Sequence, residues 1–149
     1  MVRAPKSLLD GLGERPVLAV DTAPIIYWLE GHPRLADRFA PIFSAVESGA
    51  ATIVISTVTL AEVLAGPLRV GNELLTGQYR EALTRSSGWQ VVAFDSELAV
   101  DAARIRAVYR LRLPDAIQVA TAVRAGAAAL VTHDRALKKV RGLRVLGPD

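Results

Sequence analysis

The sequence LRLPDAIQVATAVRAGAAALVTHD, at residues 111–134, contains a helix start, a helix stop, a short apolar strand and two acidic residues. Pro114 suits the first turn of a helix, because the N–H that proline lacks has no partner there. Gly126 suits the helix C-terminus, where a left-handed backbone conformation is common. The letters AAALVT then predict a strand, and Asp134 lies just beyond it. We therefore expect Asp115 and Asp134 to converge at one end of a parallel sheet.

The rest of the chain repeats this alternation of helix and strand. Compact apolar runs are typical of buried parallel strands, and the segments between them are too long for hairpins. This pattern predicts an α/β fold with three layers, α/β/α, around a central parallel sheet of about five strands. The expected strands are 16–21, 51–56, 89–94, 127–132 and 143–147, and the expected helices are 22–31, 32–49, 57–66, 72–86, 95–111, 114–125 and 134–142.

Three features set the expected ends of these helices. Thr22 is the expected cap of the first helix. Pro41 lies inside the pattern of residues 32–49 and predicts a kink or break there. Gly66 and Pro67 predict the turn of a helical hairpin between the helices at 57–66 and 72–86.

The composition fits one domain with no membrane-spanning segment and no disulfide. The chain of 149 residues is long enough to bury a core, 51% of it is hydrophobic, and it contains no cysteine. No apolar run reaches the roughly 18 residues that a membrane span needs, and the first residues lack the core of a signal peptide, so a cytoplasmic protein is expected. Residues 1–15 show no sustained periodicity and are expected to be an N-terminal extension of a single domain at 16–149.

Charge is distributed unevenly along the chain. Up to Asp101 there are eight basic and twelve acidic residues, a net charge of −4, whereas from Ala102 onward there are ten and three, a net charge of +7. A basic C-terminal third favours a polyanionic partner. Arginine-rich proteins are also common in GC-rich genomes, and this explains the same excess equally well.

Four acidic residues fall at or near the carboxyl ends of expected strands, where ligands bind in open parallel sheets. Asp21 closes the first strand, and Glu62 lies about one and a half helical turns past the second. Asp115 and Asp134 frame the fourth. Each also has a local explanation, since the aspartates suit helix caps or first turns and Glu62 forms a capping-box pattern with Thr59. Together, however, the four predict an acidic cluster at one sheet edge.

A cluster of carboxylates requires protons or cations. Unit charges about 4 Å apart repel by about 4 kcal/mol at an effective dielectric near 20, so four acids would take up protons or hold a cation. An all-oxygen site favours Mg²⁺ or Mn²⁺. With no cysteine and only His32 and His133, a zinc site of the usual composition is not expected.

The segments around the four acids resemble those of PIN-domain ribonucleases, and most closely the VapC toxins of bacterial toxin–antitoxin pairs. The resemblance extends over roughly residues 16–146. Its motifs are VLAVDTAPIIYWL around Asp21, ISTVTLAEVLAG around Glu62, LPDAIQVATA around Asp115 and LVTHD ending at Asp134. The chain departs from the family pattern at Pro24, at His133, where the family often has asparagine, and in its longer N-terminal segment.

The resemblance implies a PIN-like nuclease domain at 16–149 that hydrolyses RNA phosphodiester bonds with Mg²⁺, or alternatively Mn²⁺. It also implies a homodimer and inhibition by a cognate VapB-like antitoxin. An antitoxin helix would bury apolar side chains at the hairpin 57–86 and the groove near Tyr27 and Trp28. The catalytic and metal-binding residues it implies are Asp21, Glu62, Asp115 and Asp134.

Further side chains are candidates for supporting roles. The hydroxyls of Thr22 and Thr132 could contact the acids, and Arg106 and Arg110, four residues apart, could contact RNA backbone. An exposed, solvated helix face explains these arginines equally well.

Two other functions stay open: a non-catalytic RNA- or partner-binding module, and a metal-dependent hydrolase of small phosphate esters. Ala23 argues against the second, because a haloacid-type phosphatase has an aspartate at that position.

Overall fold

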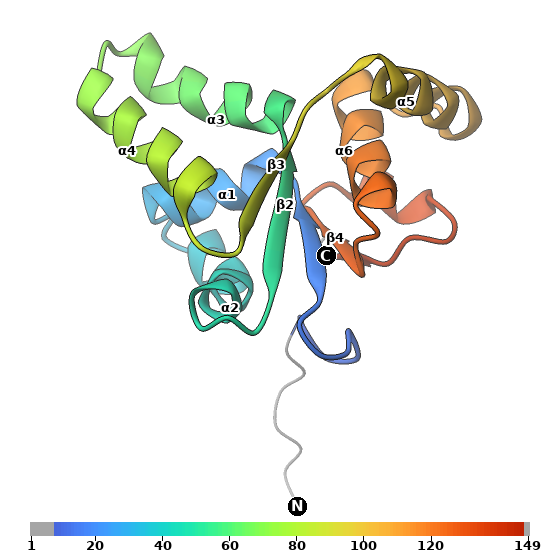
Figure 1. Cartoon of the computed structure of the whole chain (residues 1–149), viewed down its shortest axis with the longest axis horizontal. Helices are drawn as coiled ribbons and strands as arrows, with labels where there is room; N and C mark the ends of the chain where they lie inside the picture. Colours follow the sequence, from blue (N-terminus) through green and yellow to red (C-terminus); the bar gives the residue numbers. More distant parts are fainter. Residues whose placement is uncertain (1–7, 148–149) are drawn as a thin grey trace, which may run out of the picture.

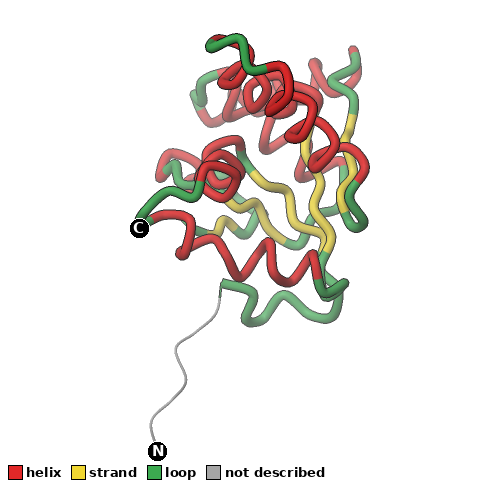
Figure 2. The backbone as a smooth tube through the Cα atoms, turned by 90° about the vertical axis from the view of Figure 1, so that its left-hand side faces the viewer, coloured by secondary structure: helices red, strands yellow, loops and turns green. Residues whose placement is uncertain are grey.

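A computed structural model describes residues 8–147 of the chain. A sheet lies at the centre of the fold, between layers of helices (Figures 1 and 2). It has five strands in the order β3-β2-β1-β4-β5, and every strand is parallel to its neighbours. This confirms the expected class and the expected parallel sheet. The strands are β1 Val17–Val20, β2 Thr52–Ser56, β3 Trp89–Val92, β4 Ala129–Val131 and β5 Val145–Leu146.

The helices alternate with these strands and begin where capping chemistry predicts. Ser56, Asn72 and Asp95 each accept a hydrogen bond from a backbone N–H in the first turn of the helix that follows. Gly126 has a φ of +63°, the left-handed conformation expected at the end of its helix. The helices are α1 Thr22–Glu30, α2 Leu35–Glu47, α3 Thr57–Arg69, α4 Glu73–Arg85, α5 Ser96–Tyr109, α6 Leu113–Arg124 and the 3₁₀ helix η1 Arg135–Lys139.

The sheet separates two hydrophobic cores, because successive side chains of a strand point to opposite faces. In β1, Leu18 and Val20 pack with α1, α2 and the α3–α4 pair, whereas Ala19 packs with α5 and α6. Figure 1 shows the four earlier helices on one side of the sheet and the α5–α6 pair on the other. This gives the three layers, and it leaves the carboxyl ends of β1, β2 and β4 at a single edge.

Local deviations from the expected helices have physical reasons. Helix α2 continues through Pro41, because this residue is exposed and water can replace the missing hydrogen bond. Helix α3 continues through Gly66 and buried Pro67 to Arg69, so the hairpin turn lies at Gly71, where φ is +70°. The predictions of a break at residue 41 and of a turn at 66–67 are therefore wrong, whereas a kink at Pro41 stays a prediction.

Two further helix predictions need correction. The first helix is capped by Asp21, whose side chain accepts from the backbone N–H of Thr22, and not by Thr22 itself. The last expected helix, at 134–142, is only the short 3₁₀ helix η1. Arg110 lies just past α5 with a φ of +53°, so it does not continue the helical face of Arg106.

The segment before β1 packs on the first core without forming a helix or strand at residues 8–15. Leu8, Leu9 and Leu12 contact that core. Residues 1–7 of the expected extension lie outside the described residues. None of the helices within residues 8–147 combines the length and apolar character that crossing a membrane requires.

Candidate active site at the carboxyl edge of the sheet

The four acids predicted from the sequence line one open pocket of about 480 Å³. Asp21 follows β1, Glu62 lies in α3, Asp115 is in the first turn of α6, and Asp134 precedes η1. Four separate segments therefore contribute one carboxylate each. Their convergence is what the shared edge of parallel strands predicts.

Asp21 is held by two hydrogen bonds at the end of the central strand. Its Oδ1 accepts from the backbone N–H of Thr22 at 2.7 Å, and its Oδ2 accepts from the hydroxyl of Thr132 at 2.8 Å. Burial raises the pKa of Asp21, and the charges of Glu62 and Asp134 add to that rise. The two hydrogen bonds lower the pKa and so only partly offset it. The carboxylate is thus fixed in place while its charge is disfavoured.

Asp115 and Asp134 line the same pocket as Asp21, and the charge of Asp134 acts on Asp115. Asp115 is buried, at 6% exposure, and burial followed by the charge of Asp134 raises its pKa. Asp134 Oδ1 accepts from the backbone N–H of Ala136 at 2.9 Å, which makes it the cap of η1. The backbone N–H of Asp134 in turn donates to the hydroxyl of Thr132 at 3.0 Å. Asp115 thus lies in the first turn of α6 and Asp134 caps η1, as the sequence indicates, and both also line the pocket.

Glu62 has no capping role, contrary to one explanation considered for it. Ser56 caps α3 by accepting from the N–H of Thr59, so Glu62 lies in the second turn and not at a capping-box position. Its side chain lines the pocket. Helix capping therefore does not account for an acid at this position.

A buried polar network beneath the pocket was not predicted from the sequence. The hydroxyl of Thr59 accepts from the Gln118 side-chain amide at 2.7 Å and from the Thr22 hydroxyl at 3.4 Å. These contacts join α1, α3 and α6, the helices that carry or follow three of the acids. They pair residues 37 and 59 positions apart, which no local spacing reveals.

Tyr27 and His133 form another wall of the pocket. The Tyr27 hydroxyl and His133 Nδ1 are 2.9 Å apart, and the two rings meet edge-on with centroids 5.5 Å apart. Tyr27 was expected near a partner groove and not at the acids. The i, i+3, i+4 spacing of Ala23, Ile26 and Tyr27, all of which line the pocket, was the available signal. Trp28 instead stacks on Phe43, in the core.

Two arginines lie at the same pocket, Arg112 and Arg135. Arg112 forms ion pairs with Asp115, at 3.5 Å, and with Asp134, at 3.9 Å. Neither arginine was among the predicted site residues, because a charged residue beside a helix start carries no distinctive sequence signal. The pocket therefore combines four acidic side chains with two basic ones.

The acids fit a hard divalent cation by their chemistry. All four donors are carboxylate oxygens, the ligands that Mg²⁺ and Mn²⁺ prefer. Burial, and after it the charges of the neighbouring acids, raises the pKa values of Asp21 and Asp115, and a bound cation would relieve the repulsion between these charges. Within residues 8–147, however, no three acidic or histidine side chains are already drawn together as a metal site. The carboxylates that would bind the cation are present, but in this structure they are not grouped closely enough to form a metal site.

Comparisons with solved structures place the fold among toxin–antitoxin proteins. VapBC2 from Rickettsia felis, bound to a promoter DNA fragment, matches with a TM-score of 0.68 and 17% identity over 87% of this chain and 96% of that chain. A toxin–antitoxin complex from Klebsiella pneumoniae gives 0.65 and 23%, over 89% and 98%. VapC20 from Mycobacterium tuberculosis, a Sarcin-Ricin loop cleaving toxin, gives 0.67 and 14%, over 87% and 99%. At these identities the similarity establishes the fold.

Sequence comparison identifies the family. No curated protein sequence gives a significant match. The family model of the PIN domain matches residues 18–143, which include all four acids of the pocket. The strand order, the acidic edge and this match agree, and the chain belongs to the PIN-domain family.

Proposed function

We propose that this protein is a divalent-metal-dependent endoribonuclease that hydrolyses phosphodiester bonds in RNA. The observation that carries the proposal is the convergence of Asp21, Glu62, Asp115 and Asp134 on one pocket at the carboxyl edge of the sheet. Membership of the PIN-domain family supports the same activity. A domain extending over residues 16–149, preceded by an N-terminal segment, is proposed as the nuclease unit.

In this proposal the four carboxylates hold Mg²⁺, or alternatively Mn²⁺. Asp21, Asp115 and Glu62 are the direct ligands, and Asp134 completes the set directly or through water. A divalent cation at such a site supplies water activation and neutralisation of charge at a phosphate. Mutual repulsion of the acids supports this assignment, because a cation makes their charged forms favourable.

The chain's own side chains orient these ligands and the substrate. Thr132 and the N–H of Thr22 each hold one oxygen of Asp21, which fixes the plane of its carboxylate. Arg112 and Arg135 offer guanidinium donors at the pocket for phosphate oxygens. Lys138 and Lys139, in the last turn of η1, extend the positive charge along which RNA backbone would lie.

The proposed biological role is that of a VapC-type toxin inhibited by a VapB-like antitoxin. The similar structures from Rickettsia felis and Klebsiella pneumoniae are toxin–antitoxin complexes, and this chain covers nearly all of each matched chain. An apolar pocket of about 700 Å³ between α1 and α3 adjoins the acids and shares Thr22, Ile26 and Glu62 with the acidic pocket. An antitoxin helix seated there would bury apolar side chains beside the acids. A homodimer is proposed on the same resemblance.

RNA cleavage assays test the nuclease. We expect structured RNA to be cleaved with Mg²⁺ or Mn²⁺ and not with EDTA, and we expect Asp115→Asn to reduce cleavage to background while circular dichroism shows an intact fold. The control is Asp37→Asn, because this exposed aspartate in α2 lies outside the pocket. Full cleavage by Asp115→Asn would contradict the assignment. Hydrolysis of p-nitrophenyl phosphate but not RNA would favour the small-phosphate hydrolase.

Co-expression tests the toxin role. The product of a small adjacent reading frame should co-purify with this protein and suppress its RNA cleavage. A substitution in the apolar pocket, such as Ala61→Arg, should weaken that co-purification and leave cleavage by the free protein intact. If no adjacent product binds, a free-standing nuclease is the better description.

A further inference from the structure

Arg112 occupies a position that helix formation does not explain. It occupies the N-cap position of α6, but its side chain makes no hydrogen bond to the N–H groups of the first turn. Ser, Thr, Asp and Asn are the preferred residues there, and a cation at a helix N-terminus meets the positive end of the helix dipole. The local structure therefore disfavours an arginine at this position.

The contacts of Arg112 lie in the acidic pocket. Its Nε is 3.5 Å from Oδ2 of Asp115, and its Nη2 is 3.9 Å from Oδ2 of Asp134. The two acids come from different elements, α6 and the start of η1, so one guanidinium spans both. The Arg112 side chain is 78% exposed, whereas that of Asp115 is 8% exposed. A solvent-exposed cation is thus placed against a buried carboxylate.

We propose that Arg112 is a built-in counter-ion that competes with the divalent cation for Asp115 and Asp134, and that cation binding releases its guanidinium to the RNA backbone. This inference rests on the proposed function, because it assumes that these two acids are metal ligands. It adds a coupling between the metal and the substrate that the acids alone do not provide.

The strength of the ion pairs suits such an exchange. Both distances are long for ion pairs, and ion pairs with an exposed partner are weak. A divalent cation can therefore displace the guanidinium, at the cost of a somewhat lower affinity for the metal. Once released, the planar guanidinium of Arg112 has the geometry to donate hydrogen bonds to two phosphate oxygens at once. Its exposure leaves the side chain free to turn from the acids toward a substrate at the pocket.

Calorimetric titration of the full chain with Mn²⁺ tests the competition. Arg112→Gln should bind Mn²⁺ roughly twofold to fivefold more tightly than the wild type, the factor expected from loss of a weak ion pair. Arg135→Gln is the matched control, because Arg135 lines the same pocket but forms no ion pair with its acids among the described residues. Equal affinities of wild type and Arg112→Gln, or equal gains in the two variants, would overturn the proposal.

A second measurement tests the release of the guanidinium. Binding of a fluorescent RNA is followed by stopped-flow anisotropy with Mn²⁺ and with EDTA, and only the binding phase that precedes cleavage is analysed. Arg112→Gln should weaken RNA binding with Mn²⁺ and leave it nearly unchanged with EDTA, since the wild-type guanidinium is then held by the acids. Equal weakening under both conditions contradicts the exchange. If neither protein binds Mn²⁺, the proposed function fails together with this inference, whereas Mn²⁺-dependent cleavage with unchanged Mn²⁺ affinity rejects the inference alone.

Discussion

The hydroxyl of Thr132 donates a hydrogen bond to Asp21 across 2.8 Å and so joins the carboxyl ends of β4 and β1. The same oxygen accepts from the N–H of Asp134, which lies two residues further along the chain. One fully buried hydroxyl therefore fixes the relative position of two pocket acids that are far apart in sequence.

Thr132→Val should destabilise the protein by about 1–3 kcal/mol, because it leaves a charged acceptor and a backbone donor without their partner. Urea denaturation at neutral pH measures this loss. Thr132→Ser is the control, since it keeps the hydroxyl and removes only one buried methyl group. A Ser variant as unstable as the Val variant would mean that packing, and not the hydrogen bond, is what Thr132 contributes.

Asp115→Asn should stabilise the metal-free protein at pH 7. Burial and the neighbouring Asp134 raise the pKa of Asp115, so the folded state holds its proton more tightly than the unfolded state. The stability linked to this group is therefore complete at acid pH and is lost as the pH rises through the folded-state pKa. Removing the charge should raise the free energy of unfolding by about 0.5–2 kcal/mol, the usual gain from relieving an unfavourable charge.

Urea denaturation midpoints, measured in EDTA between pH 3.5 and pH 7, report the difference in stability between Asp115→Asn and the wild type. This difference should disappear near pH 4, about where an aspartate in the unfolded chain is half protonated. Asp37→Asn, at an exposed site, should give no such pH-dependent gain. A gain from Asp115→Asn that is the same at every pH would show that its cause is not the charge.

Gly147→Ala should cost about 2–5 kcal/mol. A methyl group there would lie 2.5 Å from the Thr132 carbonyl oxygen and 2.6 Å from a ring carbon of Phe39, and the residue has a φ of +104°. Overpacking of about 1–3 kcal/mol and left-handed strain of about 1–2 kcal/mol add here. Gly126→Ala isolates the second contribution, because its φ is +63° and nothing lies within 4 Å. Thermal denaturation measures the loss of stability in each variant. If Gly147→Ala and Gly126→Ala lose the same stability, steric overlap does not contribute at Gly147.

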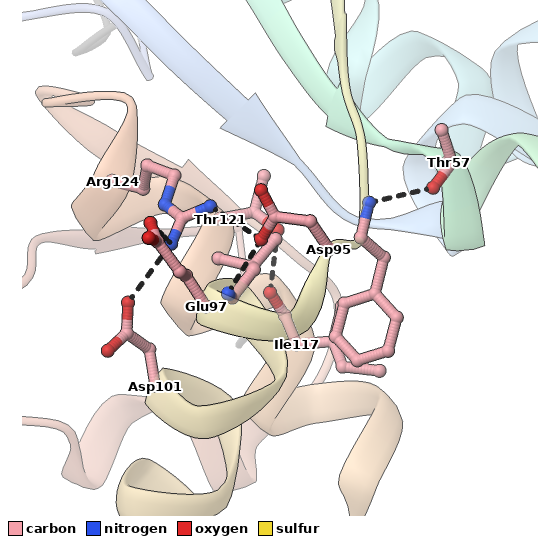
Figure 3. A network of polar contacts seen from close by, with 9 residues as sticks. Thr57, Asp95, Glu97, Asp101, Ile117, Thr121 and Arg124 are labelled. Atoms are coloured by element: carbon pink, nitrogen blue, oxygen red, sulfur yellow. Dashed lines mark hydrogen bonds and ion pairs between the residues drawn. The ribbon is translucent and has the colours of Figure 1, made fainter.

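Arg124→Gln should loosen the contact between α5 and α6. The Arg124 guanidinium pairs with Asp95 at 3.0 Å, Asp101 at 3.5 Å and Glu97 at 3.8 Å (Figure 3). We expect a lower Tm at low salt and a smaller difference at 1 M NaCl, where the screening length falls to about 3 Å. Arg104→Gln, in the same helix pair, serves as a control for loss of positive charge. A difference that salt does not change would indicate that the arginine acts by packing.

The sequence predicts the placement of Asp21, Asp115 and Asp134 well, because turn and cap residues mark the ends of parallel strands and those ends share an edge. Pro67 shows the limit of such local signals. It was expected to end a helix, but it lies buried inside α3, which stays helical to Arg69. The contact of Arg112 with two acids and the hydrogen bond between Thr59 and Gln118 depend on long-range geometry, which neither spacing nor propensity encodes.

The strand order has a consequence for how the protein is made. β1 lies between β2 and β4, and its residue Ala19 pairs with Val54 on one side and with Leu130 on the other. Synthesis proceeds from the N-terminus, and a domain generally folds as a unit. The nascent chain therefore contains β1 and β2 early, but it gains Asp115 and Asp134 only after more than a hundred residues have been added. A ribosome-bound fragment stopped before α6 would carry Asp21 and Glu62 without Asp115 and Asp134, so the complete acidic pocket arises only near the end of translation.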